Sequence, residues 1–313
     1  MTSIAAQILT GRILLVVNPI SGRGAAARWG QSVAEKLRRD GASVNLVRTE
    51  GPGDARAAAS RCSRNVDAIL ALGGDGTFRE VLNGADLQAC ALGVLPAGAG
   101  NVLAGELGMS TSPVAALAQL QAGKIERIDL GTCGDQRFAA VFGAGLDAEV
   151  VRCVEENRTD HSRHADYVPH LLRLAAKLPA WHIDIALDGT PWASGMNLAV
   201  VGNTANYGGP IQFTPAASTQ DGLFDVVAGR WGTPLDLVSP AVALPLHRTH
   251  LLENVRYAKA ARIEMKAEEK VPCQLDGDFA GWLPASIECV PGGMRMLVPS
   301  DFRALQKGGG RKN

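Results

Sequence analysis

The sequence predicts two domains of different class: a doubly wound parallel α/β domain, followed by a mainly antiparallel β domain. Two observations predict the first domain. Continuous apolar runs alternate with helical patterns, and several of these runs end in glycine-rich turns. A third observation predicts the second domain, because from residue 127 onward short alternating runs are separated by turn residues. We expect domains at residues 1–126 and 127–293, with residues 294–306 returning to the first.

Composition and charge limit the class of protein. The net charge of the 313 residues is zero, so no global charge favours nucleic acid as a partner. Residues 1–64 carry ten Lys and Arg against four Asp and Glu, which suits an anionic ligand, an anionic lipid surface or a solvated basic face. The six cysteines lack paired spacing and indicate reduced thiols in a cytoplasmic protein. We expect no signal peptide and no transmembrane segment.

The first buried strand is expected at residues 12–18, RILLVVN, because a continuous apolar run is typical of a parallel strand. It ends in the glycine-containing turn NPISGRG, and a helical stretch follows at residues 25–40. Asn18 therefore lies at the carboxyl end of a strand, where open α/β sheets place their ligand sites. Plain loop chemistry is the alternative interpretation of this turn.

The second strand is expected at residues 43–49 and the third at residues 68–72. The third strand leads into the turn GGDGT, residues 73–77, and then into residues 78–83, which have helical spacing. A strand, a glycine turn and a helix N-terminus present backbone N–H groups to a phosphate. The glycines allow positive φ and close approach of a ligand, and Thr77 can cap the helix or bond a phosphate oxygen. The alternative is a glycine-rich turn without a ligand.

The fourth strand is expected at residues 92–95, with the turn PAGAGN behind it and a helix at residues 113–124. The carboxyl ends of parallel strands lie along one edge of a sheet. The turns after the first, third and fourth strands should therefore converge on one crevice.

The string GGDGTFREVLNG, residues 73–84, resembles the diacylglycerol kinase catalytic domain, which bacterial lipid kinases share with sphingosine and ceramide kinases. The resemblance covers residues 18–278, through several motifs in the family's order. It implies an ATP-dependent kinase that phosphorylates a hydroxyl of a membrane lipid such as diacylglycerol, ceramide or a sphingoid base. The enzyme would reach this lipid from the membrane surface, and the resemblance leaves a homodimer open.

In the resemblance, the motifs NPxSGxG, GGDGT and PxGTxN bind ATP, and a threonine after the second strand also contacts the nucleotide. The positions that carry over are Asn18, Thr49, Gly73, Gly74, Gly76, Thr77, Gly98, Ala99, Gly100 and Asn101. Ala99 replaces the family's usual Thr or Ser, and Val102 stands where many bacterial members have Asp. Losing one hydrogen bond to a charged group costs about 1.5–3 kcal/mol, so activity need not be lost.

Two later strings also match the family. Residues 221–226, DGLFDV, resemble its DGxLDV, where a carboxylate and main-chain carbonyls hold a Mg²⁺ ion that orders a loop. By position, Asp221 supplies the carboxylate, and Ser218 and Leu223 contribute through the main chain. Residues 143–150, GAGLDAEV, match a glycine-rich string of the family. For these strings the alternatives are an ordinary Asp-Gly turn and a β-turn between strands.

The candidate general base is Asp276 in QLDGD, where the family has Asp-Gly-Glu and this chain has Asp278 in place of the Glu. Phosphoryl transfer needs a positioned γ-phosphate, neutralised charge and an acceptor for the hydroxyl proton, and a carboxylate can accept that proton. Asp75 would bind the catalytic Mg²⁺ or orient the base. Both Asp276 and Asp278 could instead be turn residues.

Two rival functions remain. NAD kinases also carry GGDGT, although REVLNG after the turn and the NPISGRG start disfavour that assignment. Ala99 and Val102 motivate the second rival, a lipid- or nucleotide-binding protein without turnover. A helix expected at residues 167–178 would be a lid or a membrane-facing helix, or would simply pack on the sheet.

Overall fold

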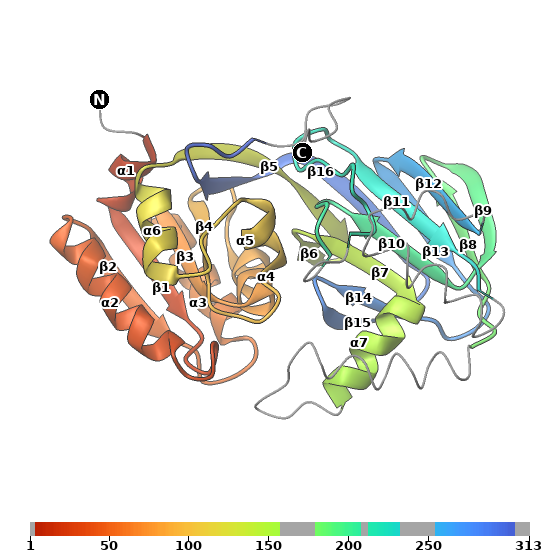
Figure 1. The fold of residues 1–313 in the computed structure, drawn as a ribbon, viewed down its shortest axis with the longest axis horizontal. Helices are drawn as coiled ribbons and strands as arrows, with labels where there is room; N and C mark the ends of the chain where they lie inside the picture. The colour runs from red at the N-terminus through yellow and green to blue at the C-terminus, as the bar shows by residue number, and fades with distance from the viewer. Residues whose placement is uncertain (1–3, 157–178, 208–211, 232–253, 304–313) are drawn as a thin grey trace. The chain divides into compact units, whose positions relative to one another are not determined.

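The computed structural model describes residues 4–156, 179–207, 212–231 and 254–303 (Figure 1). Their helices are α1 (Ile4–Leu9), α2 (Ala26–Arg39), α3 (Asp54–Cys62), η1 (Ser63–Asn65), α4 (Asp75–Gly84), α5 (Val102–Glu106), α6 (Pro113–Gln121) and α7 (Leu146–Glu156). The helix expected at residues 167–178 lies outside the described residues.

The strands follow the same chain order. They are β1 (Arg12–Val17), β2 (Ser43–Arg48), β3 (Ala68–Gly73), β4 (Ala91–Pro96), β5 (Lys124–Cys133), β6 (Gln136–Phe138), β7 (Val141–Gly145), β8 (Ile183–Leu187), β9 (Thr190–Met196), β10 (Leu198–Gly202), β11 (Phe224–Gly229), β12 (Val255–Ala260), β13 (Arg262–Lys266), β14 (Pro272–Leu275), β15 (Asp278–Trp282) and β16 (Ala285–Val298).

The described chain falls into two compact units, which we call the parallel-sheet unit and the β unit. The parallel-sheet unit extends to Asp129 and resumes at Gly292, and the β unit runs from Leu130 to Pro291. The sequence placed the boundary at residue 126, whereas the division falls inside β5. A ten-residue strand runs through this point, so no turn or linker signals the division in the sequence.

The parallel-sheet unit has the strand order β2-β1-β3-β4, with parallel pairing throughout. The chain moves one way from β1 to β2 and the opposite way from β2 through β3 to β4. Because β-strand crossovers are right-handed, α2 covers one face and α3 and α4 cover the other. The contacts agree, since α2 packs against α6, and α3 packs against α4. The predicted doubly wound sheet is confirmed.

Burial explains why the central strands read as continuous apolar runs. Every residue of β3 and β4 is buried, as expected for strands covered by helices on both faces. On the edge strand β2, by contrast, exposed and partly buried residues alternate along much of its length. The chain returns to this sheet through β16, where Met296 lies opposite Leu92 in parallel pairing.

The β unit is built from antiparallel strands, as predicted. One sheet has the order β12-β11-β10-β7-β14-β15, and the pairing β16-β13-β8-β9 forms the second layer. Side chains from both layers share one buried cluster that includes Phe142, Ile185 and Ile263. Within it, the rings of Phe138 and Phe224 stack with centroids 5.5 Å apart. This packing of two sheets around one core is a β-sandwich.

Helix α7 was not expected from the sequence, where the structural alternative for GAGLDAEV was a β-turn between strands. Gly145 ends β7 with a φ of +81°, and the helix begins at the next residue. The helix packs on β7, β14 and β15, and it buries Leu146, Ala148, Val151 and Val154. The glycines that precede it conceal its helical period in the sequence.

Among the described residues, no helix combines the length and the apolar character that crossing a bilayer requires.

Candidate functional site

The turns after β1 and β3 meet through their side chains. Asn18 follows β1, and its Nδ2 donates a hydrogen bond to Oγ1 of Thr77 in the first turns of α4, at 3.3 Å. β1 and β3 are neighbours, and the direction of winding reverses between them. Such a switch point is where open α/β sheets form ligand crevices. The structure therefore brings Asn18 and Thr77 together at this point.

The turns after β3 and β4 meet through their backbones. A Cβ atom at Gly98 would lie 2.5 Å from Cα of Gly74 and 3.2 Å from its nitrogen, so only glycine fits at position 98. The φ of Gly74 is −93°, which any residue can adopt. The expectation that this glycine supplies positive φ is therefore wrong, and its use is the close approach of the two turns.

The third turn is held in place by side chains. Oδ1 of Asn101 accepts a hydrogen bond from the nitrogen of Gly98 at 2.9 Å, and its Nδ2 donates to the carbonyl of Gly98 at 2.7 Å. Asp75 accepts from the nitrogen of Leu103 at 3.4 Å. A Cβ atom at Gly100 would lie 2.9 Å from Oδ2 of Asp75. Asp75 and Asn101 thus position residues 98–103.

The start of α4 also differs from expectation. The helix begins at Asp75 rather than after Thr77, so Thr77 lies inside the first turn and is not the N-cap residue. Thr77 is 7% exposed, and its side chain packs against Gly73, where a Cβ atom would lie 2.4 Å from Oγ1 of Thr77. Gly73 is therefore required for the packing of Thr77. Gly76 lies in this same turn of helix.

Glu80 is a positioning residue to which the sequence analysis assigned no role. Its Oε1 accepts from the nitrogen of Gly53 at 2.9 Å and its Oε2 from the nitrogen of Ala55 at 3.1 Å, at the N-terminus of α3. Carboxylates at this end of a helix satisfy free N–H groups and suit the helix dipole. Gly84 allows α4 and α3 to pack closely, since a Cβ atom there would lie 2.1 Å from the carbonyl oxygen of Arg56.

Thr49 follows β2, and the N-terminus of α3, which Glu80 holds by hydrogen bonds, comes a few residues later. The nitrogen of Thr49 donates to the carbonyl of Val17 at 2.9 Å, so its backbone continues the pairing of β1 with β2. Glu80 and its partner Gly53 are 27 residues apart in the sequence, so residue spacing alone could not reveal the hydrogen bond between them.

Asp276 occupies the hairpin turn between β14 and β15. Its φ is +50° and that of Gly277 is +87°, as in a type I′ turn. Its Oδ1 accepts hydrogen bonds from the nitrogens of Ala140 and Val141 at 2.8 and 2.9 Å, and its Oδ2 accepts from Ala139 at 2.8 Å. The carboxylate thus accepts hydrogen bonds from three consecutive N–H groups, those of residues 139–141, where β7 begins. Its role as the general base stays a prediction.

A polar group that the sequence analysis missed lies beside this turn. Gln274 is fully buried, and its Nε2 donates to Oδ2 of Asp147 at 3.1 Å and to the hydroxyl of Tyr207 at 3.4 Å. Its Oε1 accepts from the nitrogen of Gly277 at 2.8 Å. A Cβ atom at Gly143 would lie 1.7 Å from Oδ2 of Asp147, which explains one glycine of the GAGLDAEV string.

Asp147 is a partly buried acid in this network. Loss of hydration raises the pKa of its carboxyl to about 7, and the hydrogen bond from Gln274 offsets only part of that rise. A carboxyl with a raised pKa in a polar network is a candidate for contact with substrate, and its position in a family string was the available signal.

We expect the variant Asp147→Asn to remove a pH-dependent loss of stability. The pKa of the Asp147 carboxyl is about 7 in the folded state and 3.8 in the unfolded chain. Its contribution to the free energy of unfolding is therefore complete below pH 3.8 and is lost as the pH rises through 7. Such a shift corresponds to about 4 kcal/mol, and we expect about half, or ~2 kcal/mol, because the side chain keeps some contact with water. Urea unfolding of both proteins across this pH range measures the difference, and parallel pH profiles would contradict the assignment.

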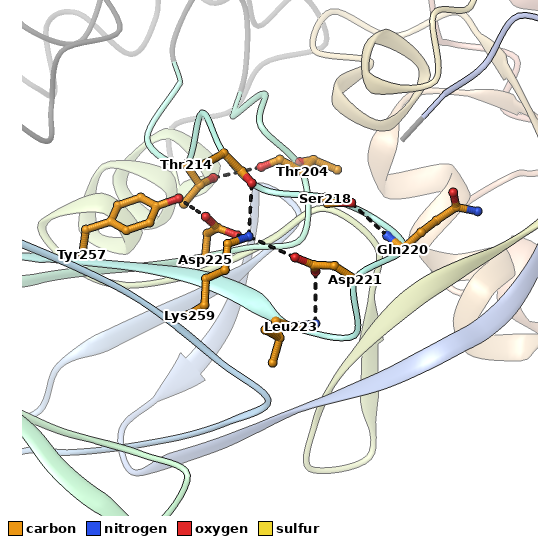
Figure 2. A network of polar contacts seen from close by, with 10 residues as sticks. Thr204, Thr214, Ser218, Gln220, Asp221, Leu223, Asp225, Tyr257 and Lys259 are labelled. Atoms are coloured by element: carbon orange, nitrogen blue, oxygen red, sulfur yellow. Dashed lines mark hydrogen bonds and ion pairs between the residues drawn. The ribbon is translucent and has the colours of Figure 1, made fainter. Parts of the chain in front are cut away.

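The predicted magnesium ligands lie in a network of polar contacts around Lys259 (Figure 2). Oδ1 of Asp221 accepts from the nitrogen of Leu223 at 3.2 Å, and Oδ2 lies 3.1 Å from Nζ of Lys259. The hydroxyl of Ser218 accepts from the nitrogen of Gln220 at 3.5 Å. Within the described part of the chain, no group of three or more His, Cys, Asp or Glu side chains could hold a metal ion.

A second carboxylate shares this ammonium. Burial raises the pKa of Asp225 to about 6, while its hydrogen bond to Lys259 acts in the opposite direction. Burial also opposes the charge on Lys259, but the hydrogen bonds to Asp225 and Asp221 outweigh it and raise the pKa of the ammonium above its ordinary value. An ammonium therefore lies where magnesium was expected, and these contacts do not favour a Mg²⁺ site.

The parallel-sheet unit is a doubly wound sheet with glycine turns at the carboxyl ends of its strands, and the β unit is a β-sandwich with a buried polar network. Open α/β sheets of this class bind their ligands at that edge. Comparison with known proteins specifies the class. Residues 12–133 match the family described as the diacylglycerol kinase catalytic domain, and residues 140–298 match the YegS C-terminal NAD kinase beta sandwich-like domain.

Two curated relatives have nearly the same length as this chain. The diacylglycerol kinase of Mycobacterium tuberculosis (strain CDC 1551 / Oshkosh) is 32% identical over 305 residues, covering 92% of this chain and 96% of the relative. That of Bacillus subtilis (strain 168) is 29% identical, covering 93% and 97%. A crystal structure of a diacylglycerol kinase from Bacillus anthracis str. Sterne has the same fold, with a TM-score of 0.74 at 24% identity over 92% of this chain and 96% of that one.

The chain belongs to the diacylglycerol kinase family of lipid kinases. The resemblance read from GGDGTFREVLNG and the prediction of a lipid kinase are confirmed.

Proposed function

We propose that the protein transfers the γ-phosphoryl group of MgATP to a hydroxyl of a membrane lipid. In this proposal the phosphates bind at the turns after β1, β3 and β4, and Asn18, Thr77 and the N-terminus of α4 contribute. Asp75 would hold the magnesium ion that accompanies the nucleotide or orient the base, and Asp276 would accept the hydroxyl proton.

One observation carries the phosphate site: the contact between Gly74 and Gly98, where even a methyl group would collide with backbone. Two turns that touch through bare backbone carry no side chain at the point where they meet. Backbone N–H groups at a helix N-terminus, here that of α4, are suited to bind phosphate oxygens. The arrangement therefore supports a nucleotide triphosphate at this edge of the sheet.

Diacylglycerol is our first choice of lipid, because the relatives from M. tuberculosis and B. subtilis both carry the name diacylglycerol kinase. Ceramide and a sphingoid base offer the same chemistry, a hydroxyl near a membrane surface. We propose that a cytoplasmic enzyme reaches a lipid of this kind by docking on the membrane from one side. The excess of basic residues within residues 1–64 suits an anionic surface.

The experiment is a transfer assay with γ-labelled ATP and Mg²⁺. Purified protein is incubated with mixed micelles that contain diacylglycerol, ceramide, sphingosine or no added lipid, and the labelled lipid is separated and counted. Label in diacylglycerol alone supports the first choice, and label in another lipid reassigns the substrate. No labelled lipid from any mixture, with nucleotide binding intact, would favour a binding protein without turnover, which the residues Ala99 and Val102 first suggested.

A further arm tests NAD as the acceptor, because the match over residues 140–298 is to a domain described as NAD kinase beta sandwich-like. The same labelled ATP is offered with NAD in place of lipid. Labelled NADP would make NAD the substrate and would contradict the lipid assignment. We expect none, since the match over residues 12–133 is to the diacylglycerol kinase domain.

We expect the variant Ala99→Thr to bind ATP more tightly. Ala99 is exposed in the third turn, so a larger side chain meets no buried neighbour. A hydroxyl there would give the phosphate one added donor, worth about 1 kcal/mol or up to about fivefold in affinity. Titration with ATP and with ADP checks the position, because a bond to the terminal phosphate strengthens ATP binding alone. Equal changes for both nucleotides, or none, would place residue 99 away from the γ-phosphate.

A further inference from the structure

The ammonium of Lys259 is surrounded by oxygen atoms (Figure 2). Its Nζ lies 2.7 Å from Oδ2 of Asp225, 3.1 Å from Oδ2 of Asp221 and 3.1 Å from the carbonyl oxygen of Ala216. Three partners match the three donors of an ammonium group. Two carboxylates and a main-chain carbonyl are also the kinds of oxygen that bind a hard divalent cation.

The strand pairing fixes the position of this ammonium. Lys259 on β12 lies directly opposite Asp225 on β11, and Asp221 lies just before β11 begins. Asp225 is fully buried and also contacts the hydroxyl of Tyr257, and the side chain of Asp221 is 6% exposed. The charge of two carboxylates with little access to water must be balanced locally, because isolated buried charges are costly.

The same contacts organise the loop that precedes β11. Lys259 reaches both Ala216 and Asp221, and Asp221 in turn accepts from the nitrogen of Leu223. Farther back, Oγ1 of Thr214 donates to the carbonyl of Thr204 at 2.9 Å. The loop 214–223 is thus tied to the sheet through the ammonium. Ordering this loop is the task that the family resemblance assigns to Mg²⁺.

A magnesium ion does not fit this set of donors while Lys259 is present. Asp221 is the one carboxylate among the predicted ligands, and each of its oxygens already has a partner. An ion bound to Oδ2 would lie within a few ångströms of a positive charge that the carboxylate already neutralises.

We propose that the ammonium of Lys259 is a built-in cation, and that it orders the loop 214–223 in place of a bound magnesium ion. The β unit of this protein is then independent of metal for its stability. The magnesium that accompanies ATP is a separate requirement at the parallel-sheet unit, so the inference does not depend on the proposed reaction.

Thermal unfolding without nucleotide or lipid tests the proposal. The wild-type midpoint should be the same in EDTA and in millimolar MgCl₂. The variant Lys259→Ala should unfold roughly 6–12 °C lower in EDTA, because it leaves two poorly hydrated carboxylates without a partner. Magnesium should then raise the midpoint of this variant by several degrees, since the vacated space and the two carboxylates form a cation site. The double variant Lys259→Ala/Asp221→Asn should lose that rescue.

The control is Lys124→Ala, which breaks the exposed ion pair with Glu126 at 2.9 Å and should shift the midpoint little in either buffer. A wild-type midpoint that falls in EDTA, with the dependence lost in Asp221→Asn, would overturn the proposal. A Lys259→Ala variant as stable as the wild type, or one that magnesium does not rescue, would also overturn it. Should Lys259→Ala fail to fold, the wild-type comparison decides the question together with Lys259→Met, which fills the space without the charge. We expect Lys259→Met to be less stable than the wild type in both buffers, and wild-type stability of this variant would overturn the proposal.

Discussion

Replacing Gly98 with alanine is expected to weaken the binding of MgATP at least tenfold, which is about 1.4 kcal/mol. The added methyl group would lie 2.5 Å from Cα of Gly74, so the turns after β3 and β4 must move apart. Both partners in this contact are backbone, and neither can rotate away as a flexible side chain can. A displacement of about 1 Å at a site that positions a phosphate can cost a hundredfold in turnover.

Gly105→Ala is the matched control, because it makes the same change in the same segment. Gly105 lies in α5 with nothing within 4 Å of the position of a Cβ atom. Alanine in a helix is also favoured over glycine by about 0.5–1 kcal/mol, so this variant should fold and bind normally. Nucleotide titration of both variants, with circular dichroism to verify folding, makes the comparison. Wild-type affinity in a folded Gly98→Ala protein would rule out these turns as the phosphate site.

The variant Asp276→Asn is expected to lose 10²–10⁴-fold in phosphoryl transfer if its carboxylate is the general base. The structure adds a second consequence. An amide at this position can accept from Ala140 and Val141 through its oxygen, but its NH₂ group would face the N–H of Ala139. One unsatisfied N–H costs about 1–3 kcal/mol, so the variant should also be less stable. Loss of turnover alone would therefore not identify a base.

Asp188 provides a control for the Asp-to-Asn change in this kind of turn. It occupies the hairpin turn between β8 and β9, with a φ of +48° followed by Gly189 at +81°. Its Oδ1 accepts from the nitrogens of Ala261 and Arg262 at 3.1 and 2.8 Å. Asp188→Asn thus changes the same residue in the same kind of turn, where an amide oxygen can keep both bonds.

We expect Asp188→Asn to retain both turnover and stability. The informative measurement for Asp276→Asn is turnover below its melting range, with ATP binding measured on the same sample. Near-normal turnover by folded Asp276→Asn would contradict the role of general base. Its carboxylate would then serve only to hold residues 139–141 in the turn that begins β7.

The sequence alone determined the class of each unit and the family. Burial of β3 and β4 on both faces requires continuous apolar runs, and such runs stand out in any window of the chain. The turns after the strands were also recognisable, because glycine, Asn18 and Thr77 fall where a parallel sheet must end its strands. Their convergence followed from topology, without any knowledge of side chains.

Only the tertiary structure decided which residues serve as partners. Glu80 bonds N–H groups 25 and 27 residues away, and Asp276 bonds N–H groups more than 130 residues away. Lys259 reaches Asp221 across 38 residues and stands in the position expected for magnesium. Local spacing determines which residues can form a helix, a strand or a turn. Contacts between distant residues depend on how strands pair and sheets pack, and a charge or a carboxylate acquires its role from those contacts.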